Sequence, residues 1–163
     1  MSYLRFTAHR HLNCYSERMS FPVVNGMRGI EFGSKGESRE HLIRLVLQGV
    51  KKATAGTLEW DYQAQGEPIE TVGEKLAVID SDGHHVATIC VTKVEVLRFA
   101  DVPTEFALAE GEGDLSGDDF RESHRSYWSR VEGLTITDDM QIVLVYFELI
   151  SGPLSAGVSN VVE

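Results

Sequence analysis

The apolar positions of residues 38–49, SREHLIRLVLQG, recur with the spacing of an amphipathic helix. Leu42, Leu45 and Val46 fall on one helical face. Gly49 follows the last apolar position and suits the left-handed conformation that often ends a helix. The pattern therefore predicts a helix that packs one side against a core and stops at Gly49.

Residues 73–99 carry the pattern of a β-hairpin. Two runs rich in β-branched and apolar residues flank the pair Asp82 and Gly83, a strong signal for a tight turn. In the second run the apolar positions change parity near Thr92 and Lys93. Because side chains alternate between the two faces of a strand, this change predicts a β-bulge.

Two further helices and a buried strand are predicted in the C-terminal half. Residues 101–111 form a short helix that begins near Pro103, and residues 116–133 form a longer one. Residues 139–150 are nearly all apolar, which is typical of a strand covered on both faces. Hairpins and helices together indicate an α+β fold around a β core. One face of the longer helix is predicted to hold Phe120, His124, Tyr127, Trp128 and Val131.

The two ends of the chain differ from this central part. Residues 1–29 are polar and basic without a periodic pattern, so we interpret them as an N-terminal extension, possibly flexible. Residues 151–163 have the small, polar composition of a flexible tail. A single domain is therefore predicted over residues 30–150.

Charge and cysteine content narrow the classes of partner. The 163 residues include 25 Asp and Glu against 15 Lys and Arg, a formal net charge of −10. This balance disfavours binding to long double-stranded nucleic acid. Cys14 and Cys90 form neither a disulfide framework nor a zinc motif, and the longest apolar run, residues 142–147, is too short to span a membrane. These observations predict a cytoplasmic protein without membrane partners.

Two motifs together resemble a known family. Gly49-x-Lys51-x-x-Thr54 ends a helix and enters a strand, and EGEGD at residues 110–114 precedes a helix that carries His124. In this combination the chain resembles the ASCH domain, in particular its larger bacterial branch. The resemblance covers about residues 30–150.

The resemblance implies a small PUA-like β-barrel flanked by helices, with a cleft for a nucleoside or a short single-stranded RNA. Two activities are implied: hydrolysis of the amide of acetylated cytidine, and cleavage of single-stranded RNA. A non-catalytic module that binds RNA or a nucleobase is a third alternative. By motif position, the implied catalytic residues are Lys51, Thr54 and Glu110.

Two assignments of the catalytic roles remain open. In the first, Lys51 is the base, Thr54 the nucleophile, and Glu110 donates a proton or holds the substrate. A lysine has a reference pKa of about 10.4 and is therefore charged near pH 7. To act as a base it must be neutral, which requires that desolvation lower its pKa. In the second, Glu110 accepts the proton while charged Lys51 stabilises an oxyanion. The resemblance favours the first assignment slightly.

Aromatic and basic side chains provide further candidate ligand contacts. Trp60 and Tyr62 lie two residues apart, which places them on one face of an extended segment after the lysine motif. There they can form either core or a flat wall against which a base stacks. Arg98 and Arg125 are candidates for holding a phosphate or sugar. His124 is a candidate that supports the site from the following helix.

No cofactor and no metal site are predicted. The alternating acids of residues 110–114 fail as a calcium-binding hand, because the twelfth position counted from Glu110 is Arg121 rather than glutamate. A solvated acidic loop that caps the next helix is the favoured interpretation, and a loosely held divalent ion is the alternative.

Overall fold

The structure is a computed structural model that describes residues 22–152. Most of the predicted N-terminal extension (residues 1–21) and nearly all of the predicted tail (residues 153–163) lie outside the described residues.

In the described part of the chain, six strands form one mixed sheet. In spatial order the strands are β1-β2-β4-β5-β6-β3, with β1 and β3 at the two edges. Neighbouring strands run antiparallel except β2 and β4, which are parallel. This sheet confirms the α+β class, but across residues 22–152 it is open rather than closed into a barrel. The strands are β1 (Val23–Val24), β2 (Met27–Ile30), β3 (Ala53–Thr57), β4 (Lys75–Ile79), β5 (His85–Arg98) and β6 (Gln141–Ser151).

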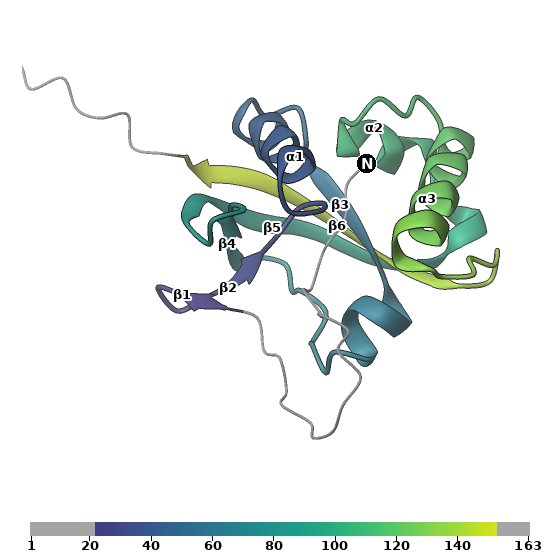
Figure 1. Cartoon of the computed structure of the whole chain (residues 1–163), viewed down its shortest axis with the longest axis horizontal. Helices are drawn as coiled ribbons and strands as arrows, with labels where there is room; N and C mark the ends of the chain where they lie inside the picture. Colours follow the sequence, from purple (N-terminus) through teal and green to yellow (C-terminus); the bar gives the residue numbers. More distant parts are fainter. Residues whose placement is uncertain (1–21, 153–163) are drawn as a thin grey trace, which may run out of the picture.

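Within residues 22–152, three α-helices cover the sheet: α1 (Glu37–Leu47), α2 (Thr104–Glu110) and α3 (Gly117–Glu132). Figure 1 shows α1 over one part of the sheet and the pair α2 and α3 to its right. A short π-helix, η1 (Leu58–Gln63), follows β3, and a 3-10 turn, η2 (Phe99–Asp101), follows β5.

Strand β6 is buried on both faces, as its apolar run predicted. Val143, Val145 and Phe147 belong to the core beneath α1. Ile142 and Leu144 alternate with them and join the second core, to which α2 and α3 contribute. Strand β6 therefore connects two cores, and β3 lies beside it at the sheet edge.

The predicted local features are largely confirmed. The β4–β5 hairpin turns at Gly83, whose φ is +87°, and the register of β5 shifts between Val91 and Lys93, where the bulge was predicted. Ser116 caps the start of helix α3, because its side chain accepts a hydrogen bond from the backbone N–H of Asp119. Val131 departs from the predicted apolar face of this helix, since it is 39% exposed.

Two segments differ from the sequence-based expectation. Strands β1 and β2 lie within or next to the predicted extension, and β2 pairs with β4 through Arg28 and Leu76. The sheet thus begins before residue 30. The segment after the lysine motif turns into η1 instead of continuing as an extended strand. Among the described residues, the structure contains no helix long and apolar enough to cross a membrane.

Candidate functional site

The end of helix α1 sets the positions of the two adjacent lysines. Gly49 adopts a φ of +69°, and the chain then turns so that the backbone N–H of Lys51 donates to the carbonyl of Leu45 at 3.1 Å. The backbone of Lys52 donates to Ala109 of α2 and accepts from β6. As strand alternation predicts, Lys52 is exposed, whereas Lys51 is only 1% exposed.

The buried amine of Lys51 lies at the open edge of β3. The carbonyl of Lys52 faces β6, so the next carbonyl, that of Ala53, faces away from the sheet. Lys51 Nζ donates to this carbonyl at 2.6 Å and to Glu112 Oε1 at 2.6 Å. The same nitrogen lies 5.4 Å from the centre of the Phe32 ring. The lysine is thus the cation of a buried ion pair fixed on three sides.

Glycine at position 111 brings the acidic loop against this amine. Helix α2 ends at Gly111 with a φ of +67°. A Cβ at this position would lie 2.4 Å from the carbonyl oxygen of Val50. Only a residue without a side chain allows this approach. The contact holds Glu110 and Glu112, on either side of Gly111, next to the lysine segment.

A second group of polar side chains lies beside the ion pair. Glu110 Oε2 is 3.5 Å from His124 Nε2, and His124 Nδ1 is 4.0 Å from Asp114 Oδ2. Glu110 and His124 are each 1% exposed. Within residues 22–152, neither oxygen of Glu110 has a hydrogen-bond partner. One ligand atom from each of Glu110, Asp114 and His124 lies within 4.8 Å of the other two, so these residues can hold a metal ion.

Burial and neighbouring charges shift the pKa values of Glu110, Glu112 and His124 in different directions. Burial, together with the charge of Glu112, raises the pKa of Glu110 well above its ordinary value, against the opposing effect of Lys51. Burial also acts to raise the pKa of Glu112, but the charge and hydrogen bond of Lys51 act against it, and the net shift is downward. Burial lowers the pKa of His124 to about 4. Glu112 is therefore the ionised partner of the lysine.

The structure brings Lys51 and Glu110 into one region, but their direct contacts differ from those predicted. Lys51 contacts Glu112 directly, and Glu110 faces His124 instead. Thr54 is fully buried in β3, where it pairs with Val145. His124 reaches this region from α3. The carboxylate that contacts the lysine is thus two residues beyond the predicted one.

Trp60 and Tyr62 do not form one aromatic wall. Both lie on η1, where residues two apart point in different directions. Trp60 is 39% exposed, whereas Tyr62 is buried in the core beneath α1. The hydroxyl of Tyr62 donates to Glu70 at 2.9 Å. The prediction of a shared face is wrong because it assumed an extended strand.

Arg98 and Arg125 have their own partners away from the lysine. Arg98, at the end of β5, donates to Asp101 and Asp139. Arg125 donates to the carbonyl of Ile136 at 2.8 Å and to Asp138 at 2.7 Å. These guanidinium groups therefore tie the loop before β6 to its neighbours.

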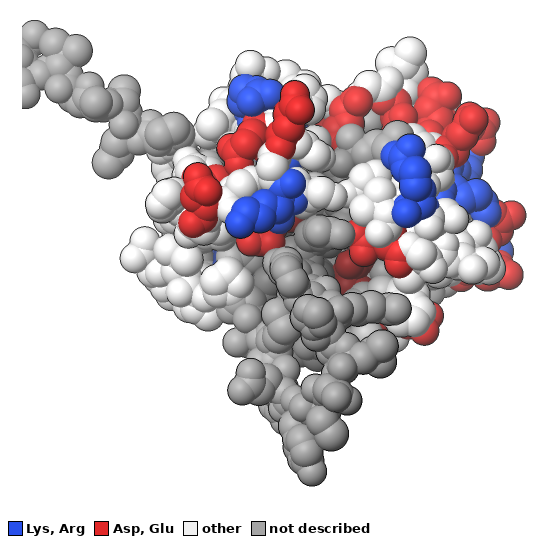
Figure 2. All heavy atoms as spheres, viewed as in Figure 1, with Lys and Arg blue, Asp and Glu red and all other residues white. Residues whose placement is uncertain are grey.

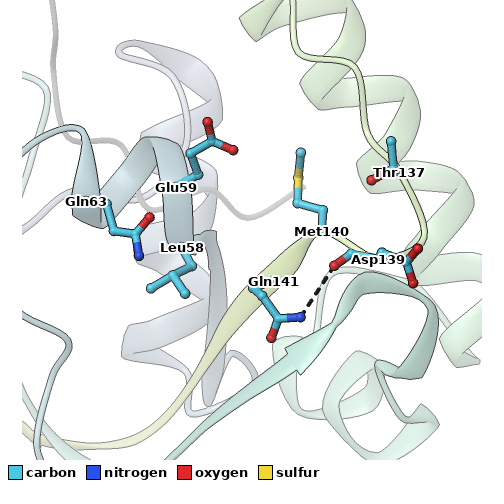
Figure 3. A pocket seen from close by; sticks show the side chains of 7 residues that line it. All are labelled: Leu58, Glu59, Gln63, Thr137, Asp139, Met140 and Gln141. Atoms are coloured by element: carbon cyan, nitrogen blue, oxygen red, sulfur yellow. Dashed lines mark hydrogen bonds between the residues drawn. The ribbon is translucent and has the colours of Figure 1, made fainter.

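A cavity of about 460 Å³ lies at the far end of β3 from Lys51. Figure 3 shows Leu58, Glu59 and Gln63 of η1 on one side of it and the loop that precedes β6 on the other. Thr57, at the end of β3 next to η1, pairs with Ile142. Ala53, at the other end of β3 and two residues after Lys51, pairs with Tyr146. The cavity and the buried ion pair are thus separate features of the two strands.

The surface around α2 and α3 is mainly acidic. On the face in Figure 2, carboxylates gather over these helices and their loops, and the described residues of this face form no continuous basic track. Negative charge on this face repels an extended polyanion.

Glu112 and Asp114 are the residues that the motif argument undervalued. Their signal in the sequence is the alternation of acids with Gly111 and Gly113. Both glycines have positive φ, +67° and +112°. A loop built in this way turns tightly, so acids two residues apart reach different partners.

Residues 28–151 match the family model of the ASCH domain. Among solved structures, the ASCH domain from Lactobacillus crispatus JV V101 is similar, with 31% sequence identity and a TM-score of 0.63 over 73% of this chain and 76% of that chain. Protein EF3133 from Enterococcus faecalis V583 is similar at 30% identity, with a TM-score of 0.64 over 74% of each chain. No curated protein matches the sequence.

Proposed function

Because the chain belongs to the ASCH domain family, we propose that it binds a nucleoside at the edge of β3 and hydrolyses the amide of an acetylated cytidine. The observation that carries this proposal is the Lys51–Glu112 ion pair, with an N–O distance of 2.6 Å and both side chains at most 3% exposed. Burying two charges is costly, and a buried pair often adds little stability. A costly buried pair that includes the motif lysine supports a functional role.

The ion pair favours the second of the two assignments of roles. A lysine that acts as a cation stabilises the negative oxygen that forms when a nucleophile adds to the amide carbonyl. A carboxylate of the 110–114 loop then accepts the proton of the nucleophile. Thr54 is the predicted nucleophile. Its hydroxyl oxygen takes the acetyl group and the exocyclic amine leaves protonated; water then cleaves the ester, releasing acetate and restoring Thr54.

The chain provides a matched control for the test. Lys51→Ala removes the buried amine, and Lys52→Ala removes the exposed amine next to it. Both variants and the wild type are incubated with acetylated cytidine and with a single-stranded RNA, and cytidine and RNA fragments are measured. The proposal predicts cytidine release that Lys51→Ala abolishes and Lys52→Ala retains.

Other outcomes separate the alternatives. RNA fragments without cytidine release would indicate a ribonuclease. A saturable thermal shift with nucleosides and no product from either substrate would indicate a binding module. Cytidine release that persists in Lys51→Ala would remove this lysine from the mechanism.

A further inference from the structure

We propose that Glu110, Asp114 and His124 form a binding site for a divalent transition-metal ion such as Zn²⁺. The site joins the last residue of α2, the following loop and the second turn of α3. It lies next to the Lys51–Glu112 ion pair but uses other side chains. The inference concerns metal binding and does not depend on the proposed hydrolysis.

His124 presents its ring as a metal-binding histidine does. Its Nδ1 lies 3.0 Å from the carbonyl oxygen of Phe120. Since a carbonyl only accepts, Nδ1 carries the hydrogen, and Nε2 has a free electron pair directed toward Glu110. Metal-bound histidines commonly donate their other ring nitrogen in this way. The ring is held by stacking on Phe120 at 3.7 Å and by the edge of Trp128 at 5.2 Å.

Glu110 supplies a buried carboxyl that no described hydrogen bond occupies. Both of its oxygens lack hydrogen-bond partners among the described residues, and the residue is 1% exposed. A buried polar group in this situation costs free energy that a bound cation would offset. Its Oε2 is 3.5 Å from His124 Nε2. Two ligands of a tetrahedral zinc ion, each about 2.0–2.1 Å from the metal, are about 3.4 Å apart.

Asp114 provides the third ligand and the access to solvent. Its side chain is 19% exposed, and Ser123 Oγ donates to its Oδ2 at 2.8 Å. Hydrogen bonds of this kind orient metal-binding carboxylates. Three protein ligands leave a fourth position open for water. One imidazole nitrogen among the ligands favours Zn²⁺ or Co²⁺ over Mg²⁺ and Ca²⁺.

Isothermal titration with Zn²⁺ and the visible absorption of bound Co²⁺ test this site on the full, untagged chain after chelator treatment. The wild type is expected to bind one ion at this site. Glu110→Gln and Asp114→Asn should each weaken binding by more than the roughly 10- to 100-fold that loss of an outer-shell partner causes. Asp114→Asn changes a partly exposed side chain, so it keeps the test valid if changes at buried positions impair folding.

A second acidic group serves as the control. Asp80, Asp82 and His84 also bring ligand atoms within 4.8 Å of one another, but on the exposed β4–β5 turn. Asp82→Asn should leave the affinity for Zn²⁺ unchanged. The inference is overturned if the wild type binds neither ion, or if Asp82→Asn abolishes binding while Glu110→Gln retains it. Hydrolysis that requires Lys51, in a chain that binds no metal, would refute this inference alone.

Discussion

The carbonyl oxygen of Val50 lies 2.4 Å from the position that a Cβ on Gly111 would occupy. This approach joins the turn after α1 to the turn after α2, two segments 61 residues apart in the sequence. It is reinforced by the hydrogen bond from the backbone of Lys52 to the carbonyl of Ala109 at 2.8 Å. The contact between two backbones, rather than any side chain, therefore places the acidic loop against the lysine.

Replacement of Gly111 should disturb this arrangement more than replacement of an equivalent glycine elsewhere. Gly49 has nearly the same φ, +69° against +67°, but a Cβ at Gly49 would meet nothing within 4 Å. Gly49→Ala should lower the free energy of unfolding by about 1–2 kcal/mol, the cost of a left-handed alanine. Gly111→Ala carries the same cost and a clash with backbone. Chemical denaturation should give a clearly larger loss for Gly111→Ala, and equal losses would contradict the contact.

Glu112→Gln and Glu110→Gln should change the free energy of unfolding by different amounts. Glu112→Gln leaves the buried amine of Lys51 without its anion and should lower the free energy of unfolding by about 3–5 kcal/mol. Glu110→Gln replaces a buried carboxyl that has no hydrogen-bond partner among residues 22–152. It should therefore cost much less in the absence of added metal. Urea midpoints of the two variants check this order, and the reverse order would assign the ion pair to Glu110.

The free energy of unfolding should decrease as the pH rises, because Asp61 is buried. This residue on η1 is 7% exposed, and its Oδ2 accepts hydrogen bonds from the backbone and the hydroxyl of Thr57. Burial raises its pKa from 3.8 to about 7, although the Thr57 hydrogen bonds act to lower it. Between these two values the folded chain retains a proton that the unfolded chain releases. The contribution of Asp61 to the free energy of unfolding therefore falls as the pH rises toward 7.

Asp61→Asn should remove this dependence, because the amide oxygen still accepts from Thr57 but carries no charge. Above pH 7 the variant should be more stable than the wild type by up to about 4 kcal/mol, from about three pKa units at about 1.4 kcal/mol each. Denaturation curves at pH 5 and pH 8 measure the difference. A gap between variant and wild type that is the same at both pH values would contradict the raised pKa.

The sequence predicts the fold better than it predicts the site, and the reason is physical. Apolar periodicity reports which face of an element is buried, so β6, α3 and the bulge near Lys93 follow from it. The π-helix η1 has no such signature. Because its side chains do not alternate as those of a strand do, Trp60 is exposed to solvent and Tyr62 is buried in the core. Whether the sheet stays open or closes into a barrel also depends on the pairing of strands far apart in the sequence, which no local pattern encodes.

Lys51 and Glu110 were identified by motif position, but the partner of the lysine was not. The choice between Glu110 and Glu112 depends on how far α2 extends before Gly111 ends it, and a shift of two residues exchanges their roles. Likewise, the proximity of His124 to Glu110 arises from the packing of α2 against α3. Sequence spacing alone does not fix such distances.

The rate of cytidine release by Lys51→Met, measured beside Lys52→Met, tests most directly whether the buried amine is the working group. Methionine keeps most of the length and apolar volume of the side chain and removes only its charge. Loss of one donor to an oxyanion typically lowers kcat by about 10²–10³-fold. We expect a decrease of this size for Lys51→Met in folded protein, with Lys52→Met close to wild type. Equal rates of release for all three proteins would contradict the account.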